Sequence, residues 1–124
     1  MTDSILILIV DDSPLQRSIY SAALKAEGYE IATAADGREG VEMALQHSPA
    51  LILMDIGMPE MDGIAAVREL RRHPETAQVP VLALTAISEA EDLDAAYQAG
   101  FSDVVDKNSD RGVLLSTIRR WLFD

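Results

Sequence analysis

Cysteine is absent from the sequence, and histidine occurs only at His47 and His73. The lack of cysteine excludes disulfide bonds, thiolate zinc sites and cysteine nucleophiles. Because neither histidine falls at the end of a predicted strand, zinc is disfavoured altogether. Basic residues are scarce too: 10 lysines and arginines against 21 aspartates and glutamates give a formal net charge of −11. Such a chain repels phosphate backbones and anionic membranes, so we expect no nucleic-acid-binding surface.

Long hydrophobic runs are also missing. The first apolar run, Ile5 to Val10, follows a segment without positive charge and is too short for a signal-peptide core or a membrane span. We therefore expect a soluble, cytoplasmic protein. The 124 residues, 48% of them apolar, suit one folded domain, which we place at residues 1–124.

Short apolar runs alternate with segments of helical length. Runs of this kind are typical of strands that are covered on both faces in a parallel sheet. The predicted strands are Ile5–Val10, Ile31–Ala34, Leu51–Met54, Val81–Leu84 and Val104–Val105. Right-handed crossovers fold such an alternation into an α/β domain whose five-stranded parallel sheet has helices on both faces.

Capping signals indicate where helices begin and end. Three segments open with a capping residue followed three positions later by an acid or amide: Ser13 with Gln16, Asp36 with Glu39, and Ser88 with Glu91. Pro14 suits the first turn of the first helix, and Gly28 suits its end.

The last third of the chain offers two further expectations. An apolar stripe in the last helix should face the sheet, and its members are Leu114, Ile118, Trp121 and Leu122. The segment from His73 to Pro80 is interpreted as an ordinary surface loop.

Polar residues come directly after four of the predicted strands. They are Asp11 and Asp12 after the first, Asp55 after the third, Thr85 after the fourth and Lys107 after the fifth. In an open α/β sheet, ligands bind beyond the carboxyl ends of the strands. Each residue alone has a structural explanation, because aspartates cap helices and lysines lie on surfaces. Their joint occurrence at the same edge favours a functional site.

Three carboxylates in one pocket need cations. Like charges about 4 Å apart repel by about 4 kcal/mol at an effective dielectric constant of about 20. Lys107 supplies one positive charge, and Mg²⁺ suits the rest because it binds one or two carboxylates and completes its shell with water and phosphate oxygens. Asp55 is the best candidate for a nucleophile that forms an aspartyl phosphate, and Gly57 permits close approach of the backbone to an ion.

From its first predicted strand to its last helix, the chain resembles the receiver domain of bacterial two-component response regulators, of the stand-alone chemotaxis or sporulation type. The resemblance rests on residues 9–13 (Ile-Val-Asp-Asp-Ser), 53–63 (Leu-Met-Asp-Ile-Gly-Met-Pro-Glu-Met-Asp-Gly), 84–86 (Leu-Thr-Ala), 99–100 (Ala-Gly) and Lys107. It implies a doubly wound, flavodoxin-like sheet of strand order 2-1-3-4-5.

The resemblance also implies roles for the site residues. Asp55 would accept a phosphoryl group from a phosphohistidine on a sensor histidine kinase or a histidine phosphotransfer protein. Magnesium would be held by Asp11, Asp12, Asp55 and the backbone carbonyl of Gly57, while Thr85 and Lys107 would contact the phosphoryl group. Phosphorylation would then alter the face formed by the fourth helix, fifth strand and fifth helix, where a downstream protein binds. The chemistry would be limited to self-catalysed phosphotransfer and autodephosphorylation, in a protein that rests as a monomer and can dimerise when phosphorylated.

Two positions depart from the family pattern. Val104 stands where the family has an aromatic residue, and Asn108 stands where a proline, often after a cis peptide bond, follows the lysine. Because a cis bond before a residue other than proline costs about 2.5 to 4 kcal/mol, we expect a trans bond between Lys107 and Asn108 and a rearranged loop.

Other functions remain as alternatives. The departures at Val104 and Asn108 favour a phosphorylation-independent interaction module with a receiver-like fold, and a receiver excised from a hybrid histidine kinase would carry the same residues. An aspartate-based phosphohydrolase is disfavoured because it would need a second acid where Gly57 stands. A dinucleotide or flavin mononucleotide site is disfavoured because Asp11 and Asp12 put negative charge where the phosphate would lie.

Overall fold

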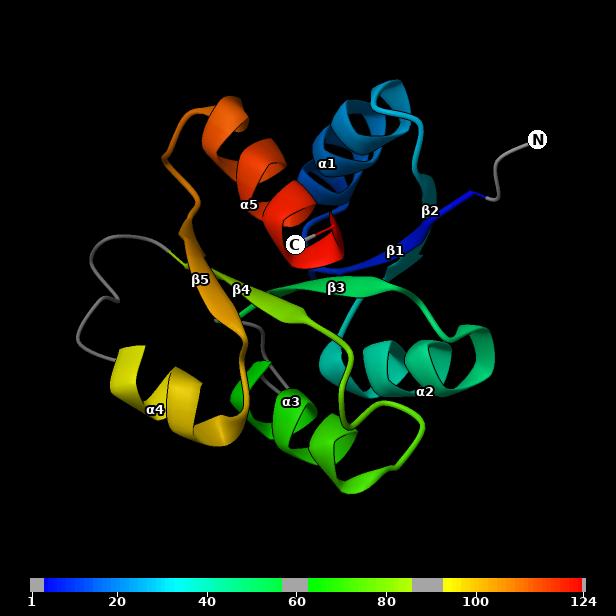
Figure 1. Cartoon of the computed structure of the whole chain (residues 1–124), viewed down its shortest axis with the longest axis vertical. Coiled ribbons are helices and arrows are strands. Elements are labelled where there is room, and N and C mark those ends of the chain that lie inside the picture. The colour runs from blue at the N-terminus through cyan, green and yellow to red at the C-terminus, as the bar shows by residue number, and fades with distance from the viewer. Residues whose placement is uncertain (1–3, 57–62, 86–92, 124) are drawn as a thin grey trace.

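The computed structural model describes residues 4–56, 63–85 and 93–123. Its five strands form one parallel sheet in the order β2-β1-β3-β4-β5, which confirms the predicted doubly wound α/β fold. Helices α1 and α5 cover one face of the sheet, and α2, α3 and α4 cover the other (Figure 1). The strands are β1 (Leu6–Val10), β2 (Glu30–Ala34), β3 (Leu51–Asp55), β4 (Val81–Thr85) and β5 (Asp103–Asp106). The helices are α1 (Pro14–Ala26), α2 (Gly37–His47), α3 (Gly63–Arg72), α4 (Leu93–Ala99) and α5 (Arg111–Phe123).

Each central strand contributes to two cores because successive side chains point to opposite faces of the sheet. In β1, Leu8 and Val10 pack on the side of α2, α3 and α4, whereas Ile7 and Ile9 pack on the side of α1 and α5. All residues of β3 and β4 are buried. The unbroken apolar runs of the sequence therefore follow from burial on both faces.

The strand ends differ from their predicted positions. Asp55 and Thr85 are the last residues of β3 and β4, and do not follow them. The fifth strand extends beyond Val104 and Val105 to an aspartate on either side, because its backbone pairs with β4 over four positions. β5 is an edge strand, and polar side chains are tolerated there.

Two of the three predicted capping pairs are confirmed. Ser13 Oγ accepts a hydrogen bond from Gln16 N at 3.2 Å, and Asp36 Oδ1 accepts one from Glu39 N at 2.9 Å. The third pair, Ser88 and Glu91, lies outside the described residues. The expectation for α5 holds for Leu114, Ile118 and Leu122, which pack against the core. It is wrong for Trp121, which lies at the edge of the stripe, is 39% exposed, and donates from Nε1 to Asp103 Oδ2 at 2.9 Å.

The segment from His73 to Pro80 is a surface loop, as predicted, and Arg71 donates hydrogen bonds to its backbone. Arg71 Nη1 donates to the carbonyl oxygens of Thr76, Ala77 and Val79, and its Nε donates to Gly100 O at 3.0 Å. None of these acceptors is a carboxylate, and burial lowers the pKa of Arg71. One guanidinium thus joins the α3–β4 loop to the end of α4, at the edge of the sheet opposite the polar residues. Within the part of the chain described here, no helix is both long and apolar enough to cross a membrane.

Replacing Arg71 with methionine should lower the free energy of unfolding by about 2 to 4 kcal/mol, because several buried carbonyl groups lose their donor. Urea denaturation measures the change. Arg72→Met is the matched control, since Arg72 is 75% exposed and, among the described residues, its guanidinium pairs with Glu69 alone, at 3.4 Å. This variant should cost less than about 0.5 kcal/mol. Equal losses in the two variants would contradict the role given to Arg71.

Candidate functional site

The predicted site residues meet at the carboxyl edge of the sheet. The register pairs Val10 with Met54, Asp55 with Leu84, and Thr85 with Asp106, so the ends of β1, β3, β4 and β5 are level with one another. The backbone N–H of Lys107 donates to Thr85 O at 2.8 Å, which carries the lysine to the end of β4. Parallel pairing therefore brings residues from four separate parts of the chain to one place.

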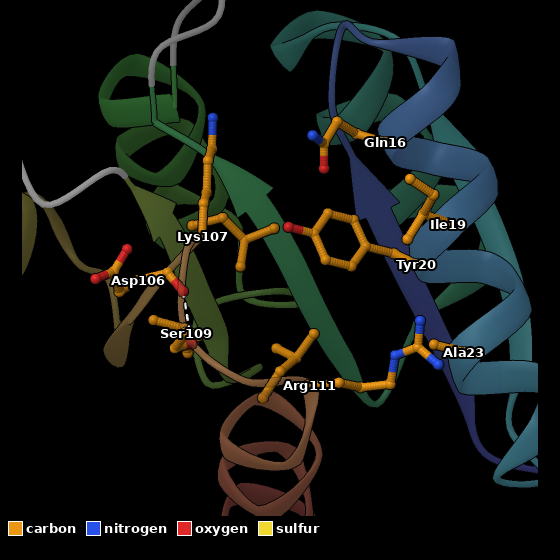
Figure 2. A pocket seen from close by; sticks show the side chains of 11 residues that line it. Gln16, Ile19, Tyr20, Ala23, Asp106, Lys107, Ser109 and Arg111 are labelled. Atoms are coloured by element: carbon orange, nitrogen blue, oxygen red, sulfur yellow. Dashed lines mark hydrogen bonds between the residues drawn. The ribbon is translucent and has the colours of Figure 1, made fainter.

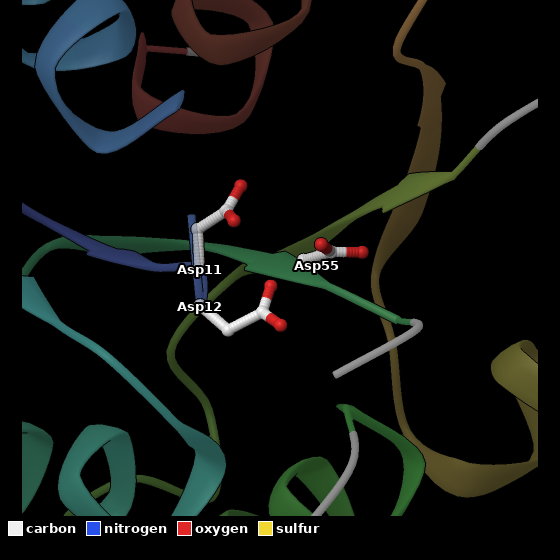
Figure 3. A group of neighbouring side chains, drawn as sticks. All are labelled: Asp11, Asp12 and Asp55. Carbon is white, nitrogen blue, oxygen red and sulfur yellow. The ribbon is translucent and has the colours of Figure 1, made fainter. Parts of the chain in front are cut away.

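Three carboxylates form the centre of this site. Asp11, Asp12 and Asp55 each place one oxygen within 4.8 Å of the others (Figure 3). Asp11 is 1% exposed and Asp55 is 5% exposed, whereas Asp12 faces solvent. Two of the three carboxylates of the predicted site are therefore buried.

The two carboxylate oxygens of Asp11 differ in their hydrogen bonding. Its Oδ1 accepts a hydrogen bond from Ser13 N at 2.9 Å, while its buried Oδ2 meets no hydrogen-bond donor in the described ranges. Burial raises the pKa of Asp11 most, the hydrogen bond from Ser13 opposes this, and the negative charge of Asp55 adds to the rise. A carboxylate oxygen left in this way beside two other acids fits a hard divalent cation such as Mg²⁺.

Lys107 provides the counter-charge at the opposite side of the cluster. Its Nζ lies 3.0 Å from Asp55 Oδ1. No cis peptide bond occurs among the described residues, so the bond between Lys107 and Asn108 is trans, as expected. The turn that follows is built by Asp106, whose Oδ1 accepts from Asn108 N at 2.9 Å and whose carbonyl accepts from Ser109 Oγ at 2.6 Å. These bonds stabilise the turn that carries Lys107 without a proline.

A cavity of about 190 Å³ lies between α1 and α5, and Lys107 is one of the residues that line it. Tyr20 projects into it from α1, across from the segment that carries Lys107 (Figure 2). Burial raises the pKa of Tyr20 most, and the negative charge of Asp11 raises it further. The phenol therefore stays protonated at neutral pH, as a hydroxyl beside the acidic site.

Three residues that shape the site were given no role by the sequence analysis. Gly63 begins α3 so close to β3 that an added Cβ would lie 2.7 Å from the carbonyl oxygen of Asp55. Tyr20 lines the cavity, and Arg17 donates from Nη1 to the carbonyl oxygen of Asp11 at 2.7 Å. Gly63 ends a motif that carries the family resemblance, but its close packing against β3 follows only from the tertiary fold. An arginine in the first turns of a helix carries no signal of its own. Gly57, a predicted ligand through its carbonyl, lies outside the described residues.

Comparison with known families decides the identity of this arrangement. Residues 7–119 match the model of the response regulator receiver domain. The chain belongs to this family. It is a receiver domain of two-component systems, a family of signalling domains rather than of true enzymes, which confirms the resemblance seen in the sequence. Receiver domains bind Mg²⁺ at an acidic pocket, and they interact with histidine kinases or phosphotransfer proteins and with downstream targets.

Individual relatives agree with this assignment. The chain is 38% identical over 112 residues to Protein PilH of Pseudomonas aeruginosa, covering 90% of this chain and 93% of PilH. It is 36% identical over 116 residues to the DNA-binding dual master transcriptional regulator RpaA of Synechocystis, covering 94% of this chain but only 48% of RpaA. The crystal structure of the receiver domain of a sensor histidine kinase from P. aeruginosa, with a magnesium ion coordinated in its active-site cleft, superimposes with a TM-score of 0.91 at 34% identity, covering 98% of this chain and 100% of that domain.

The burial of Asp11 predicts a pH-dependent stability. Because the pKa of Asp11 is raised above 3.8 in the folded protein, ionisation of this carboxyl lowers the free energy of unfolding. The loss of stability is absent below pH 3.8, grows as the pH rises from there through the folded-state pKa, and is complete above that pKa. Asp11→Asn, which keeps an acceptor for Ser13, should therefore raise the urea midpoint of the protein at pH 7 in EDTA. The gain should shrink as the pH falls toward 4.

The control is Asp36→Asn, since Asp36 also accepts a backbone hydrogen bond, from Glu39, but is only half-buried at the start of α2. It should leave the midpoint nearly unchanged at either pH. A loss of stability in Asp11→Asn at pH 7 would show that the ionised carboxylate is favourable even without metal.

Proposed function

We propose that Asp55 is the phosphoacceptor of this receiver domain. One of its carboxylate oxygens attacks the phosphorus of a phosphohistidine; the new O–P bond forms as the P–N bond breaks, and the imidazole leaves with the electron pair of that bond and takes up a proton. The observation that carries this proposal is the placement of Asp55. It is nearly buried at the end of β3, between the carboxylates of Asp11 and Asp12 and the ammonium of Lys107.

Asp11, Asp12, Asp55 and the carbonyl of Gly57 are the proposed ligands of Mg²⁺. The support is the buried Asp11 Oδ2, which lacks a donor among the described residues, and the short distances between the carboxylates. When bound there, Mg²⁺ would neutralise the charge that develops on the transferred phosphoryl oxygens. The carboxylates of the chain would hold the ion beside Asp55.

Thr85 and Lys107 are proposed to contact the phosphoryl group. Lys107 already lies 3.0 Å from Asp55 Oδ1, and its backbone is bonded to Thr85. A phosphoryl group on Asp55 carries more negative charge than the free carboxylate, so the ammonium follows it. The movement then acts on the turn after β5 and, through it, on α5.

The face formed by α4, β5 and α5 is the proposed surface for a downstream protein. Asp103 joins all three elements, because its carboxylate accepts from Trp121 Nε1 of α5 at 2.9 Å and from Tyr97 Oη of α4 at 3.4 Å. Tyr97 and Trp121 are both exposed. A sensor histidine kinase or a histidine phosphotransfer protein is the proposed donor at the acidic edge. We place residues 1–124 in one domain. We place the protein in the cytoplasm, where a histidine kinase has access to ATP.

A phosphorylation-independent interaction module is the second candidate. It is favoured by Val104, which packs against the core on the side of α4 and offers no aromatic ring that could change its position on phosphorylation. The two candidates share a fold and a partner surface, and they differ in whether Asp55 is modified and whether modification alters that surface. A receiver that forms part of a hybrid histidine kinase would behave as the first candidate does.

Incubation with acetyl phosphate and Mg²⁺ should add one phosphoryl group to the protein. The intact mass should show this gain in the wild type, and EDTA or Asp55→Asn should abolish it. Asp36→Asn, an amide substitution at a carboxylate outside the acidic cluster, should leave it unchanged. Phosphorylation that persists in Asp55→Asn at any residue distant from the acidic edge would sink the assignment, and a wild type without gain even in the presence of histidine kinases would favour the interaction module.

Lys107→Ala should weaken signalling more than acceptance of the phosphoryl group. Trp121 is the single tryptophan and is bonded to β5, so its fluorescence reports on the proposed partner face. In the wild type we expect a change in this fluorescence that follows phosphorylation measured by mass. In Lys107→Ala the fluorescence change should fall by about tenfold, while the phosphorylated fraction falls by no more than about threefold. A proportional loss of both signals would refute the separate role of Lys107.

A further inference from the structure

Arg17 makes an unusual contact with the loop that carries two of the carboxylates. It belongs to the first turns of α1, yet its side chain reaches back to the end of β1, where Nη1 donates to the carbonyl oxygen of Asp11 at 2.7 Å. The short distance fits a charge-assisted hydrogen bond. The side chain lies along the groove between α1 and the edge strand β2, where it is only partly exposed.

The bonded carbonyl belongs to the peptide group that joins Asp11 to Asp12. Rotation of this group changes ψ of Asp11 and φ of Asp12, and so changes where the two carboxylates point relative to each other. On its other side, Asp11 is fixed by its backbone N–H, which donates to Ala34 O at 3.1 Å, and by Oδ1, which accepts from Ser13 N at 2.9 Å. With the carbonyl held by Arg17, the polar group of Asp11 that remains for a cation is Oδ2.

We propose that Arg17 is a positioning residue for the metal site: it holds the Asp11–Asp12 peptide in the orientation that directs both carboxylates toward Mg²⁺, and it thereby sets the affinity for the ion. This inference rests on the proposed function. It concerns Arg17 alone, which is neither a ligand of the ion nor a contact of the phosphoryl group.

In this proposal Arg17 affects Mg²⁺ binding by holding the Asp11–Asp12 peptide group, and not by the effect of its charge on the ion. A positive charge near a cation site also repels the cation, so neutralising Arg17 by itself would strengthen Mg²⁺ binding. Loss of the positioning bond has the opposite effect, and the sign of the change separates the two roles.

A purely structural role is also distinguishable. The start of α1 is capped independently by Ser13, and the helix is anchored in the core by Leu24. Removing the guanidinium therefore leaves the helix in place. A residue that only stabilised α1 would change the urea midpoint and leave the affinity of the folded protein for Mg²⁺ as it is.

The test compares Arg17→Met, which keeps an apolar stem without a donor, with Arg17→Lys, which restores one donor and the charge. Arg119→Met is the control, because it removes the same charge from an exposed pair with Glu27, at the far end of α1. Isothermal titration calorimetry gives the Kd for Mg²⁺, and acetyl phosphate assays give the Mg²⁺ concentration for half-maximal phosphorylation and the rate at saturating Mg²⁺.

For Arg17→Met we expect both Mg²⁺ constants to rise about tenfold, in the range seen when groups that orient metal ligands are removed, with the rate at saturating Mg²⁺ within about twofold of the wild type. Arg17→Lys should recover most of the affinity, and Arg119→Met should bind as the wild type does. Unchanged or tighter binding in Arg17→Met overturns the proposal. If Arg17→Met does not fold, a Kd for Arg17→Lys equal to or below that of the wild type overturns it instead, because one ammonium donor cannot fully replace the guanidinium.

The proposed function can fail separately. A wild type that binds Mg²⁺ but is never phosphorylated at Asp55 contradicts the phosphoacceptor assignment, and the calorimetric comparison of the Arg17 variants still stands. A wild type that binds no Mg²⁺ contradicts both.

Discussion

The constraint on which this structure depends is the burial of negative charge at the carboxyl edge of the sheet. Parallel pairing brings Asp11 and Asp55 side by side at the ends of β1 and β3, and Asp12 completes the cluster. One ammonium, that of Lys107, lies in contact with it. In the part of the chain that the structure describes, three acids face one base, and the buried Oδ2 of Asp11 has no hydrogen-bond donor. The proposed affinity for a divalent cation, and for a phosphoryl group bound to that cation, would follow from this imbalance of charge.

The two edges of the sheet handle buried polar groups in opposite ways. At the amino edge, Arg71 supplies donors to the carbonyl groups of the α3–β4 loop and to Gly100, so its acceptors there are neutral. At the carboxyl edge, Asp11 Oδ2 is buried without a donor among the described residues. The amino edge is therefore held together by bonds within the chain, whereas the proposed Mg²⁺ would complete the carboxyl edge.

The sequence predicts the fold and the acidic site because both follow from local patterns. Apolar runs on both faces define the central strands, and the residues that end β1, β3 and β4 must meet at one edge once the sheet is parallel. The contributions of Arg17, Tyr20 and Arg71 could not be predicted, because each acts on a segment that only the tertiary fold brings near. Trp121 was misplaced for a related reason. Helical spacing puts it at the border of the apolar stripe, and only the position of Asp103 on β5 decides that its indole turns to the edge.

The proposed route from the acidic site to the face formed by α4, β5 and α5 depends on the residue at position 104. Valine has no aromatic ring that could turn inward or outward, so a change at Asp55 would be transmitted along the backbone of β5 and the turn after it. Lys107 stands at one end of this route, bonded to Thr85 through its N–H and to Asp55 through its ammonium. Asp103 stands at the other end and is bonded to α4 and α5. A small displacement of β5 would therefore move both α4 and α5, because the carboxylate of Asp103 is hydrogen-bonded to both helices.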